Sequence, residues 1–258
     1  MPIHSQLIND LNQKQVLKII SGCVNNFNEK EITETIIAAD LGGATYIDIA
    51  ADTKIISLAT QLTTLPLCIS SIIPKQIFNC IEKGVTIVEI GNFDAFYSQS
   101  MHFNLQDIKN ISKQIRTSYP EVTLCTTLPY ILSLKEQVEL TKFLEFIGID
   151  LIQTEGTINN NTINTRSNLR LEKSHSTLLT TYNLSKLVNL PIIAASGISH
   201  KNGSSAILYG ASGVGVKTAV INQKGLKNKI KLVELIKKSI ASKSLKISMS
   251  KQSTIKLP

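Results

Sequence analysis

The chain has 258 residues, of which 43% are hydrophobic and 18% are charged, and its mean hydropathy is +0.11. This composition supports a sizeable core and excludes a wholly disordered chain, because disorder requires low hydrophobicity and high net charge. No apolar run approaches the roughly 18 residues that a membrane-spanning helix needs, so we predict no membrane span. Residues 1–15 lack an apolar segment, and we therefore also expect no secretory signal.

The net charge of +8 is concentrated at the C-terminus. From Lys224 onward the chain carries ten lysines and one acid, Glu234, whereas residues 1–223 have a net charge of −1. A basic end can contact nucleic acid, an anionic partner or nothing. Because the rest of the chain is nearly neutral, we expect nucleic acid not to be a partner, and the sequence leaves a homo-oligomer open.

Short β-branched apolar runs alternate with longer amphipathic stretches along the chain. An initial helix is predicted over residues 2–14. The predicted strands cover 16–21, 44–50, 66–70, 86–91, 121–127, 150–155, 191–196 and 212–216. The predicted helices that follow them cover 28–42, 53–63, 74–84, 104–118, 133–148, 174–189, 203–210 and 225–241.

Regular alternation of strand and helix predicts right-handed crossovers and a parallel sheet. Eight such units in about 225 residues match the size of a closed (β/α)8 barrel, the TIM barrel. We therefore predict one α/β domain over residues 1–241, with residues 2–14 closing the bottom of the barrel. Residues 242–258 are rich in Lys and Ser and are predicted to be a loose tail.

The pattern of polar residues in the strands predicts which side chains face the barrel interior. Successive residues of a strand point to opposite sides, and the outer side must be apolar because it packs on helices. In the first, second and fourth strands this places Lys18, Asp48 and Glu89 inside. In the sixth strand it places Gln153 and Glu155 inside.

Lys18, Asp48 and Glu89 are the predicted catalytic residues. Buried charges are unfavourable unless they are paired, but a lysine between two carboxylates can be held charged and can take part in proton transfer. Gln153 and Glu155 are predicted ligand contacts. The alternative is a structural salt bridge between Lys18 and Asp48 on neighbouring strands.

The ends of the last two strands carry a predicted phosphate site. In such barrels, phosphate commonly binds after strands seven and eight, at the start of a short extra helix. Ser196 and Gly197 follow the seventh strand, and Gly215, Lys217 and Thr218 lie at the end of the eighth. Their hydroxyls, positive charge and accessible backbone suit an anion. Tight turns in a small barrel are the alternative interpretation.

The loop predicted over about 156–173 contains Arg166 and Arg170, two of the three arginines. Such a loop could close on a phosphorylated ligand as a polar lid, or it could be a solvated insertion.

No motif for a metal or cofactor is present. The segment after the first strand, residues 22–26, is not a dinucleotide-binding fingerprint, so we predict no cofactor. The four histidines, His4, His102, His175 and His200, do not occur with carboxylates at metal-ligand spacing, so we predict no metal site.

Six motifs in order resemble the hypothetical chloroplast reading frame family numbered twenty-three. They are LKIISGCVNNF (17–27), GGATYIDIAAD (42–52), EIGNFDAFY (89–97), DLIQTEGT (150–157), AASGIS (194–199) and GASGVGVKTAV (210–220). The resemblance covers about residues 15–240 and implies an organelle-encoded, aldolase-type barrel in the plastid stroma. In that family the eighth strand usually reads GVGVGSAV, so Lys217 and Thr218 replace a Gly-Ser pair here.

The chain is also distantly similar to phosphate-binding barrels such as thiazole synthase and sugar-phosphate epimerases. From this we expect a protein that binds a small phosphorylated metabolite at the C-terminal face of the barrel and acts as an isomerase, epimerase or lyase. Lys18 would be a proton donor or an imine-forming amine, and Glu89 or Asp48 the base. The alternative is a non-catalytic ligand-sensing or scaffold protein whose basic tail binds a partner.

Overall fold

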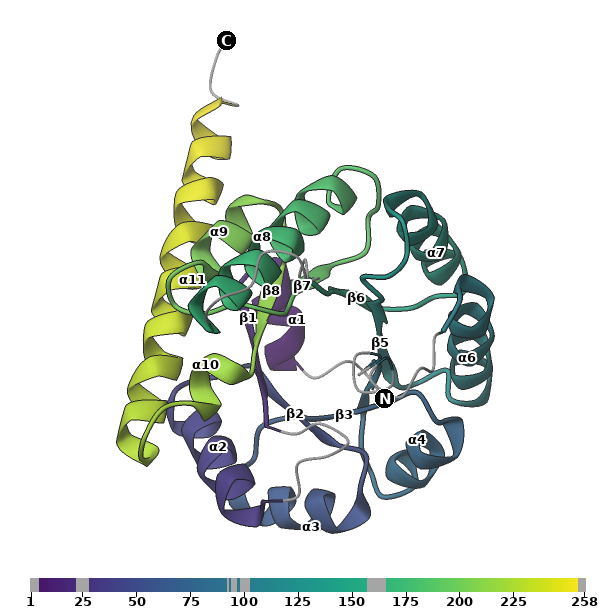
Figure 1. Ribbon diagram of the computed structural model, residues 1–258, viewed down its shortest axis with the longest axis horizontal. Helices are drawn as coiled ribbons and strands as arrows, with labels where there is room; N and C mark the ends of the chain where they lie inside the picture. The colour runs from purple at the N-terminus through teal and green to yellow at the C-terminus, as the bar shows by residue number, and fades with distance from the viewer. Residues whose placement is uncertain are drawn as a thin grey trace.

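The computed structural model describes residues 5–21, 28–91, 93, 97, 103–156 and 166–254. Eight parallel strands pair in the order β1-β2-β3-β4-β5-β6-β7-β8, and β8 pairs back with β1, so the barrel is closed (Figure 1). Helices surround it in alternation with the strands. The predicted (β/α)8 barrel is confirmed.

The strands are short and buried. They are β1 (Val16–Ile20), β2 (Tyr46–Ala50), β3 (Leu67–Ser71), β4 (Ile87–Ile90), β5 (Thr123–Leu128), β6 (Leu151–Thr154), β7 (Ile192–Ala194) and β8 (Gly213–Val216). The helices before residue 150 are α1 (Ser5–Asn12), α2 (Glu29–Leu41), α3 (Thr53–Leu62), α4 (Pro74–Ile81), α6 (Leu105–Ser118) and α7 (Leu134–Phe146). The later helices are α8 (Arg166–Leu184), α9 (Gly203–Leu208), α10 (Thr218–Ile221) and α11 (Leu226–Thr254).

Local sequence explains where several helices begin. Asn104 caps α6 and Ser133 caps α7, each in a capping box in which the acid three residues later bonds back to the cap. Asp52 accepts from two backbone N–H groups at the start of α3. Pro74 occupies the first turn of α4, where its missing N–H leaves no bond unmade. These signals fix the residues at which the helices begin.

The apolar core has two parts. The larger part lies between the strands and the helices and includes the outward-facing Ile19, Ile47 and Val88. The smaller part lies inside the barrel and consists of Leu7, Val16, Tyr46, Cys68, Ile87 and Ile193. Because Leu7 belongs to α1, this inner cluster joins the first helix to the strands.

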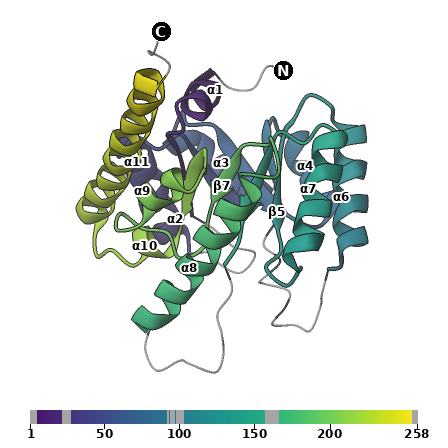
Figure 2. The same cartoon turned by 90° about the horizontal axis from the view of Figure 1, so that it is seen from above.

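Helix α1 covers one end of the barrel, as predicted (Figure 2). Asp10 of α1 accepts from Lys237 Nζ of α11 at 2.6 Å and from the Thr45 hydroxyl. The same lysine donates to the Gln15 carbonyl at 2.9 Å, and Thr45 accepts from the Leu17 N–H at 2.9 Å. This network ties the first and last helices to the start of β1.

Two predicted boundaries are wrong. Helix α11 continues to Thr254 instead of ending at residue 241, so the secondary structure of residues 242–254 is helix and not a loose tail. No glycine or proline interrupts this segment, and Ile247 within it packs against the core. Helix α8 starts at Arg166 instead of residue 174, so Arg166 and Arg170 lie on a helix. Residues 157–165 of the expected loop are outside the described residues. The division of the chain at residue 241 stays a prediction.

Among the described residues, no helix is both long and apolar enough to span a membrane.

Candidate active site

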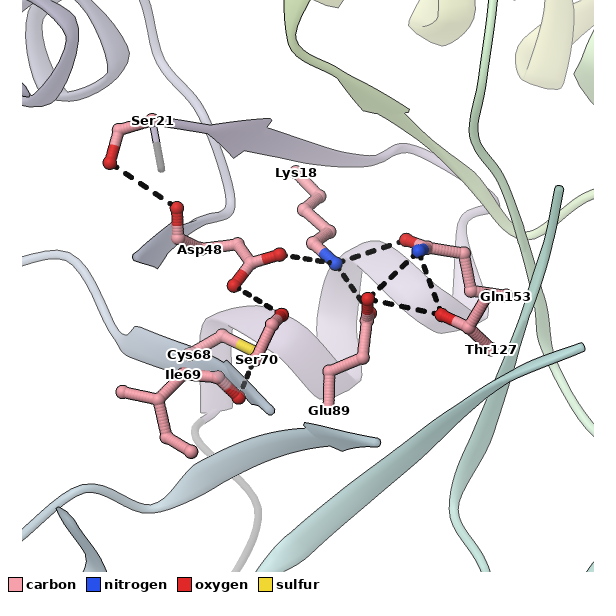
Figure 3. Close-up of polar contacts among 9 residues, drawn as sticks. All are labelled: Lys18, Ser21, Asp48, Cys68, Ile69, Ser70, Glu89, Thr127 and Gln153. Atoms are coloured by element: carbon pink, nitrogen blue, oxygen red, sulfur yellow. Dashed lines mark hydrogen bonds and ion pairs between the residues drawn. The ribbon is translucent and has the colours of Figure 1, made fainter. Parts of the chain in front are cut away.

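Four polar side chains from strands far apart in the sequence meet inside the barrel (Figure 3). Lys18 comes from β1, Asp48 from β2, Glu89 from β4 and Gln153 from β6. All four are buried: the exposed fraction is 0% for Lys18, 2% for Asp48 and for Glu89, and 6% for Gln153. The strand alternation placed each of them correctly on the inner side.

Lys18 is the centre of this cluster. Its Nζ lies 2.8 Å from Asp48 Oδ2 and 3.0 Å from Gln153 Oε1, and it also donates to Glu89 Oε2. An ammonium group has three N–H donors, and these three acceptors match that number. The amine is therefore held as a fully hydrogen-bonded cation.

The two carboxylates are held by further donors. Ser70 of β3 donates to Asp48 Oδ1 at 2.6 Å. Thr127 of β5 donates to Glu89 Oε1 at 3.1 Å, and Gln153 Nε2 donates to the same oxygen at 2.9 Å. Of these donors, Ser70 and Thr127 are not among the predicted site residues. The alternating polar residues Thr123, Cys125 and Thr127 of β5 were the available signal for Thr127.

Burial and the opposite charges act in opposite directions on the pKa values. Burial by itself lowers the pKa of the Lys18 amine, but the Asp48 and Glu89 carboxylates together outweigh burial and hold that pKa well above its ordinary value. For Asp48, burial dominates and raises the pKa from 3.8 to about 6, with Lys18 opposing the shift and Glu89 adding to it. Lys18 is thus held as a cation, and the Asp48 carboxyl binds its proton more tightly than an ordinary aspartate does.

Two glycines make room for this cluster. A side chain at Gly91 would place its Cβ 2.7 Å from Glu89 Oε1 and 2.8 Å from Thr127 Oγ1. At Gly215, the Cβ would lie 3.0 Å from Ala195 Cβ and 3.3 Å from Gln153 Oε1. Gly215 is paired with Lys18 in the sheet and is buried, so it lies at the level of the cluster. Its predicted contact with an anion stays a prediction.

The turn after β7 has an unusual backbone. Ser196 has a φ of +80° and Gly197 one of +72°, and Ser196 is half-buried. The side chain of Thr177 of α8 approaches the carbonyls of Ala195 at 3.0 Å and of Ser196 at 2.9 Å. Asn202 Nδ2 donates to the Gly197 carbonyl at 3.1 Å.

The remaining predicted ligand contacts lie at the same edge of the sheet. Glu155 follows β6 and is half-buried. Lys217 follows β8, is half-buried and precedes α10, whose first residue, Thr218, is exposed. Because β6, β7 and β8 are parallel neighbours, their carboxyl ends bring these residues and the Ser196–Gly197 turn to one rim.

In the part of the chain that the structure describes, no group of three or more His, Cys, Asp or Glu side chains could hold a metal ion.

Comparison with protein families gives one match over nearly the whole chain. Residues 3–248 match the family described as "Protein of unknown function (DUF561)". A protein named "Uncharacterized protein ycf23" from Porphyra purpurea is 43% identical over 216 residues, which is 84% of this chain and 81% of that protein. A protein of the same name from Cyanophora paradoxa is 36% identical over 235 residues, or 91% of this chain and 96% of that protein.

Solved structures share the fold at low sequence identity. Thiamine phosphate pyrophosphorylase from Pyrococcus furiosus has a TM-score of 0.62 and 17% identity, over 90% of this chain and 98% of that one. The (S)-3-O-geranylgeranylglyceryl phosphate synthase from Thermoplasma acidophilum, solved with sn-glycerol-1-phosphate, has a TM-score of 0.59 and 11% identity, over 93% of this chain and 100% of that one. At these identities the likeness shows the barrel fold alone.

Proposed function

The chain belongs to the DUF561 family and is similar to proteins named ycf23. From the polar cluster inside its barrel and the rim above it, we propose that it binds a small phosphorylated metabolite and moves a proton on it. The reaction class is isomerase, epimerase or lyase. The observation that carries the proposal is the buried Lys18 ammonium between two carboxylates. Replacing a buried ion pair with apolar residues often leaves stability unchanged, so stability alone is a weak reason for such a cluster.

The phosphate is proposed to bind at the rim formed by Ser196, Gly197, Lys217 and Thr218. Rims after strands seven and eight are the usual phosphate sites of this fold. The thiamine phosphate and glyceryl phosphate enzymes with the same fold act on phosphorylated compounds, as their names state, which supports the assignment by analogy. Lys217 supplies positive charge at this rim.

Lys18 is assigned electrostatic stabilisation and not imine formation. An amine attacks a carbonyl through a lone pair, and an ammonium that donates to Asp48, Glu89 and Gln153 has none. A charged ammonium instead favours the negative charge that develops on a substrate oxygen when a neighbouring C–H bond loses its proton.

Asp48 is the better candidate for the base. Glu89 accepts from Lys18, Gln153 and Thr127, whereas Asp48 accepts through its side chain from Lys18 and Ser70. Burial raises the pKa of Asp48 to about 6, close to the neutral pH at which a general base is most effective. In the proposed step, Asp48 takes the proton from a carbon beside a carbonyl, the C–H electron pair forms an enolate whose negative charge the Lys18 cation favours electrostatically, and the proton returns to carbon.

Equilibrium dialysis tests the binding part of the proposal. Triose, tetrose and pentose phosphates and the matching unphosphorylated sugars are the probes. We expect retention of at least one phosphorylated probe and of none of its unphosphorylated partners. Because one charge contact on the phosphate would be lost, Lys217→Met should weaken retention by about fivefold.

Lys109→Met is the control, since that lysine pairs with Glu139 on the outer surface. It should bind like the wild type. Failure of the wild type to retain any phosphorylated probe would overturn the proposal.

A second candidate is a ligand-sensing or scaffold protein without turnover. It is favoured by the basic outer face of α11, where Lys227, Lys231 and Lys238 are exposed. This candidate predicts binding of the phosphorylated ligand with no chemical change to it, which separates it from the enzyme.

The plastid stroma is the proposed location. The support is the shared name of the curated relatives, which include proteins of Porphyra purpurea, Pyropia yezoensis and Cyanophora paradoxa.

A further inference from the structure

The turn at Ser196 and Gly197 is held in a conformation that it would not adopt alone. Two consecutive residues have positive φ, at +80° and +72°. For Gly197 this is unstrained, but for Ser196 the left-handed region brings the side chain against its own backbone. Such a residue persists only where its surroundings enforce it, and these positions cluster at ligand sites.

Two side chains outside the turn enforce it. Thr177 of α8 is buried, and its hydroxyl lies 2.9 Å from the Ser196 carbonyl and 3.0 Å from the Ala195 carbonyl. Asn202 donates to the Gly197 carbonyl and also accepts from the Ser199 N–H at 2.7 Å. The carbonyl groups of the turn therefore face Thr177 and Asn202. The N–H groups of Ser196 and Gly197 donate no backbone hydrogen bond to any described residue.

The segment after β6 packs on the same turn of α8. A side chain at Gly156 would place its Cβ 2.0 Å from the Lys173 carbonyl and 2.5 Å from Thr177 Oγ1. Thr177 Oγ1 also lies 2.9 Å from that Lys173 carbonyl. One helical turn thus lies between the ends of β6 and β7, and Thr177 is its contact with both.

We propose that Thr177 is a positioning residue, which holds the Ser196–Gly197 turn so that its two N–H groups bind the phosphate of the ligand. The inference rests on the phosphate site of the proposed function and assigns a residue that does not itself touch the ligand. Without the hydroxyl, the turn is free to relax from the strained φ of Ser196, and its N–H groups lose their common direction.

Binding of inorganic phosphate, followed by ³¹P NMR titration, tests this role. Thr177→Val removes the hydroxyl at nearly constant volume and should weaken phosphate binding about tenfold, the effect of one lost restraining hydrogen bond. Thr177→Ser keeps the hydroxyl and should bind within about twofold of the wild type.

Thr141 of α7 provides the matched control. It is also a buried helical threonine, and its hydroxyl donates to the Gln137 carbonyl of its own helix at 2.7 Å. Thr141→Val should lower the melting temperature as Thr177→Val does but leave phosphate affinity unchanged. A merely structural role for Thr177 would make the two valine variants alike, which would overturn the inference while wild-type binding upheld the proposed function.

A second variant covers the case in which Thr177→Val does not fold. Asn202→Ala removes the other restraint at a half-buried position, and it should weaken phosphate binding several-fold. Unchanged affinity in Asn202→Ala would also overturn the restrained-turn account. Absence of phosphate binding by the wild type would be a failure of the proposed function itself, and this inference would fall with it.

Discussion

Lys18, Asp48 and Glu89 place buried ion pairs in the barrel interior, where apolar side chains would ordinarily pack. The cation is enclosed by strands whose outer faces are apolar, and Tyr46 and Cys68 lie in the same barrel interior and interact with it electrostatically. Burial raises the pKa of both the Tyr46 hydroxyl and the Cys68 thiol, so these two stay neutral. Burial also raises the pKa of Asp48, to about 6, which brings its titration closer to neutral pH.

The raised pKa of Asp48 predicts a particular pH dependence of stability. Between pH 3.8 and about 6 the folded protein holds the Asp48 proton more tightly than the unfolded chain does. The contribution of Asp48 to the free energy of unfolding must then fall as the pH rises through this window. Asp48→Asn does not titrate, so urea unfolding should show that the wild-type free energy minus that of Asp48→Asn decreases from pH 4 to pH 6.

Ser70→Ala is the control for this measurement, because it removes a hydrogen bond to Asp48 but keeps the carboxyl group. It should retain the decrease. A difference between wild type and Asp48→Asn that stays constant or rises over the window would contradict the assignment.

For individual residues, the sequence predicts the polar cluster inside the barrel, but it does not predict the threonines that hydrogen-bond to the cluster or to the rim. Lys18, Asp48, Glu89 and Gln153 stand out because a polar residue between apolar ones in a buried strand needs a partner. Thr127 does not stand out, since threonine is common in strands for its shape. Thr177 lies within a helix in no motif, and its contacts with the β7 turn depend on how α8 packs.

Helices α1 and α11 come from opposite ends of the sequence and are joined by an ion pair. The Asp10 side chain is buried, and Lys237 of α11 is the cation paired with it in the described part of the chain. This contact spans almost the whole sequence, and helical periodicity could not have predicted it. The same applies to the length of α11, because Ile247 packs on the core beyond the predicted helix end.

Loss of Lys237 should be destabilising. Lys237→Met leaves the Asp10 carboxylate buried without its cation and should lower the free energy of unfolding by about 2–3 kcal/mol, less than for a fully buried pair because the lysine is partly exposed. Lys238→Met is the matched control, since the Lys238 side chain is 77% exposed and its ion pair with Glu234 is long, at 3.8 Å. It should change stability by less than about 0.5 kcal/mol. If Lys237→Met and Lys238→Met lowered the free energy of unfolding equally, the Asp10–Lys237 network would not stabilise the fold.

The closed barrel is what turns separated sequence motifs into one site. Residues from β1, β2, β4 and β6 reach each other because β8 pairs back with β1, and Figure 3 shows that the side chains of Lys18, Asp48, Glu89 and Gln153 point toward one another. The eight repeats of strand and helix are visible in the sequence because short apolar runs alternate with longer amphipathic stretches. The rim is less predictable, since the conformation of Ser196 depends on α8 and α9 and not on its own neighbours.

The most direct test of the whole account is deuterium exchange into the phosphorylated compound that the protein retains, incubated in D2O and followed by ¹H NMR. If Asp48 moves a proton beside a carbonyl, the wild type should introduce deuterium at that carbon. Asp48→Asn should slow the exchange by at least about 100-fold, and Lys109→Met should not. A compound that binds yet exchanges no faster with the wild type than without protein would contradict the catalytic claim and leave only a binding protein.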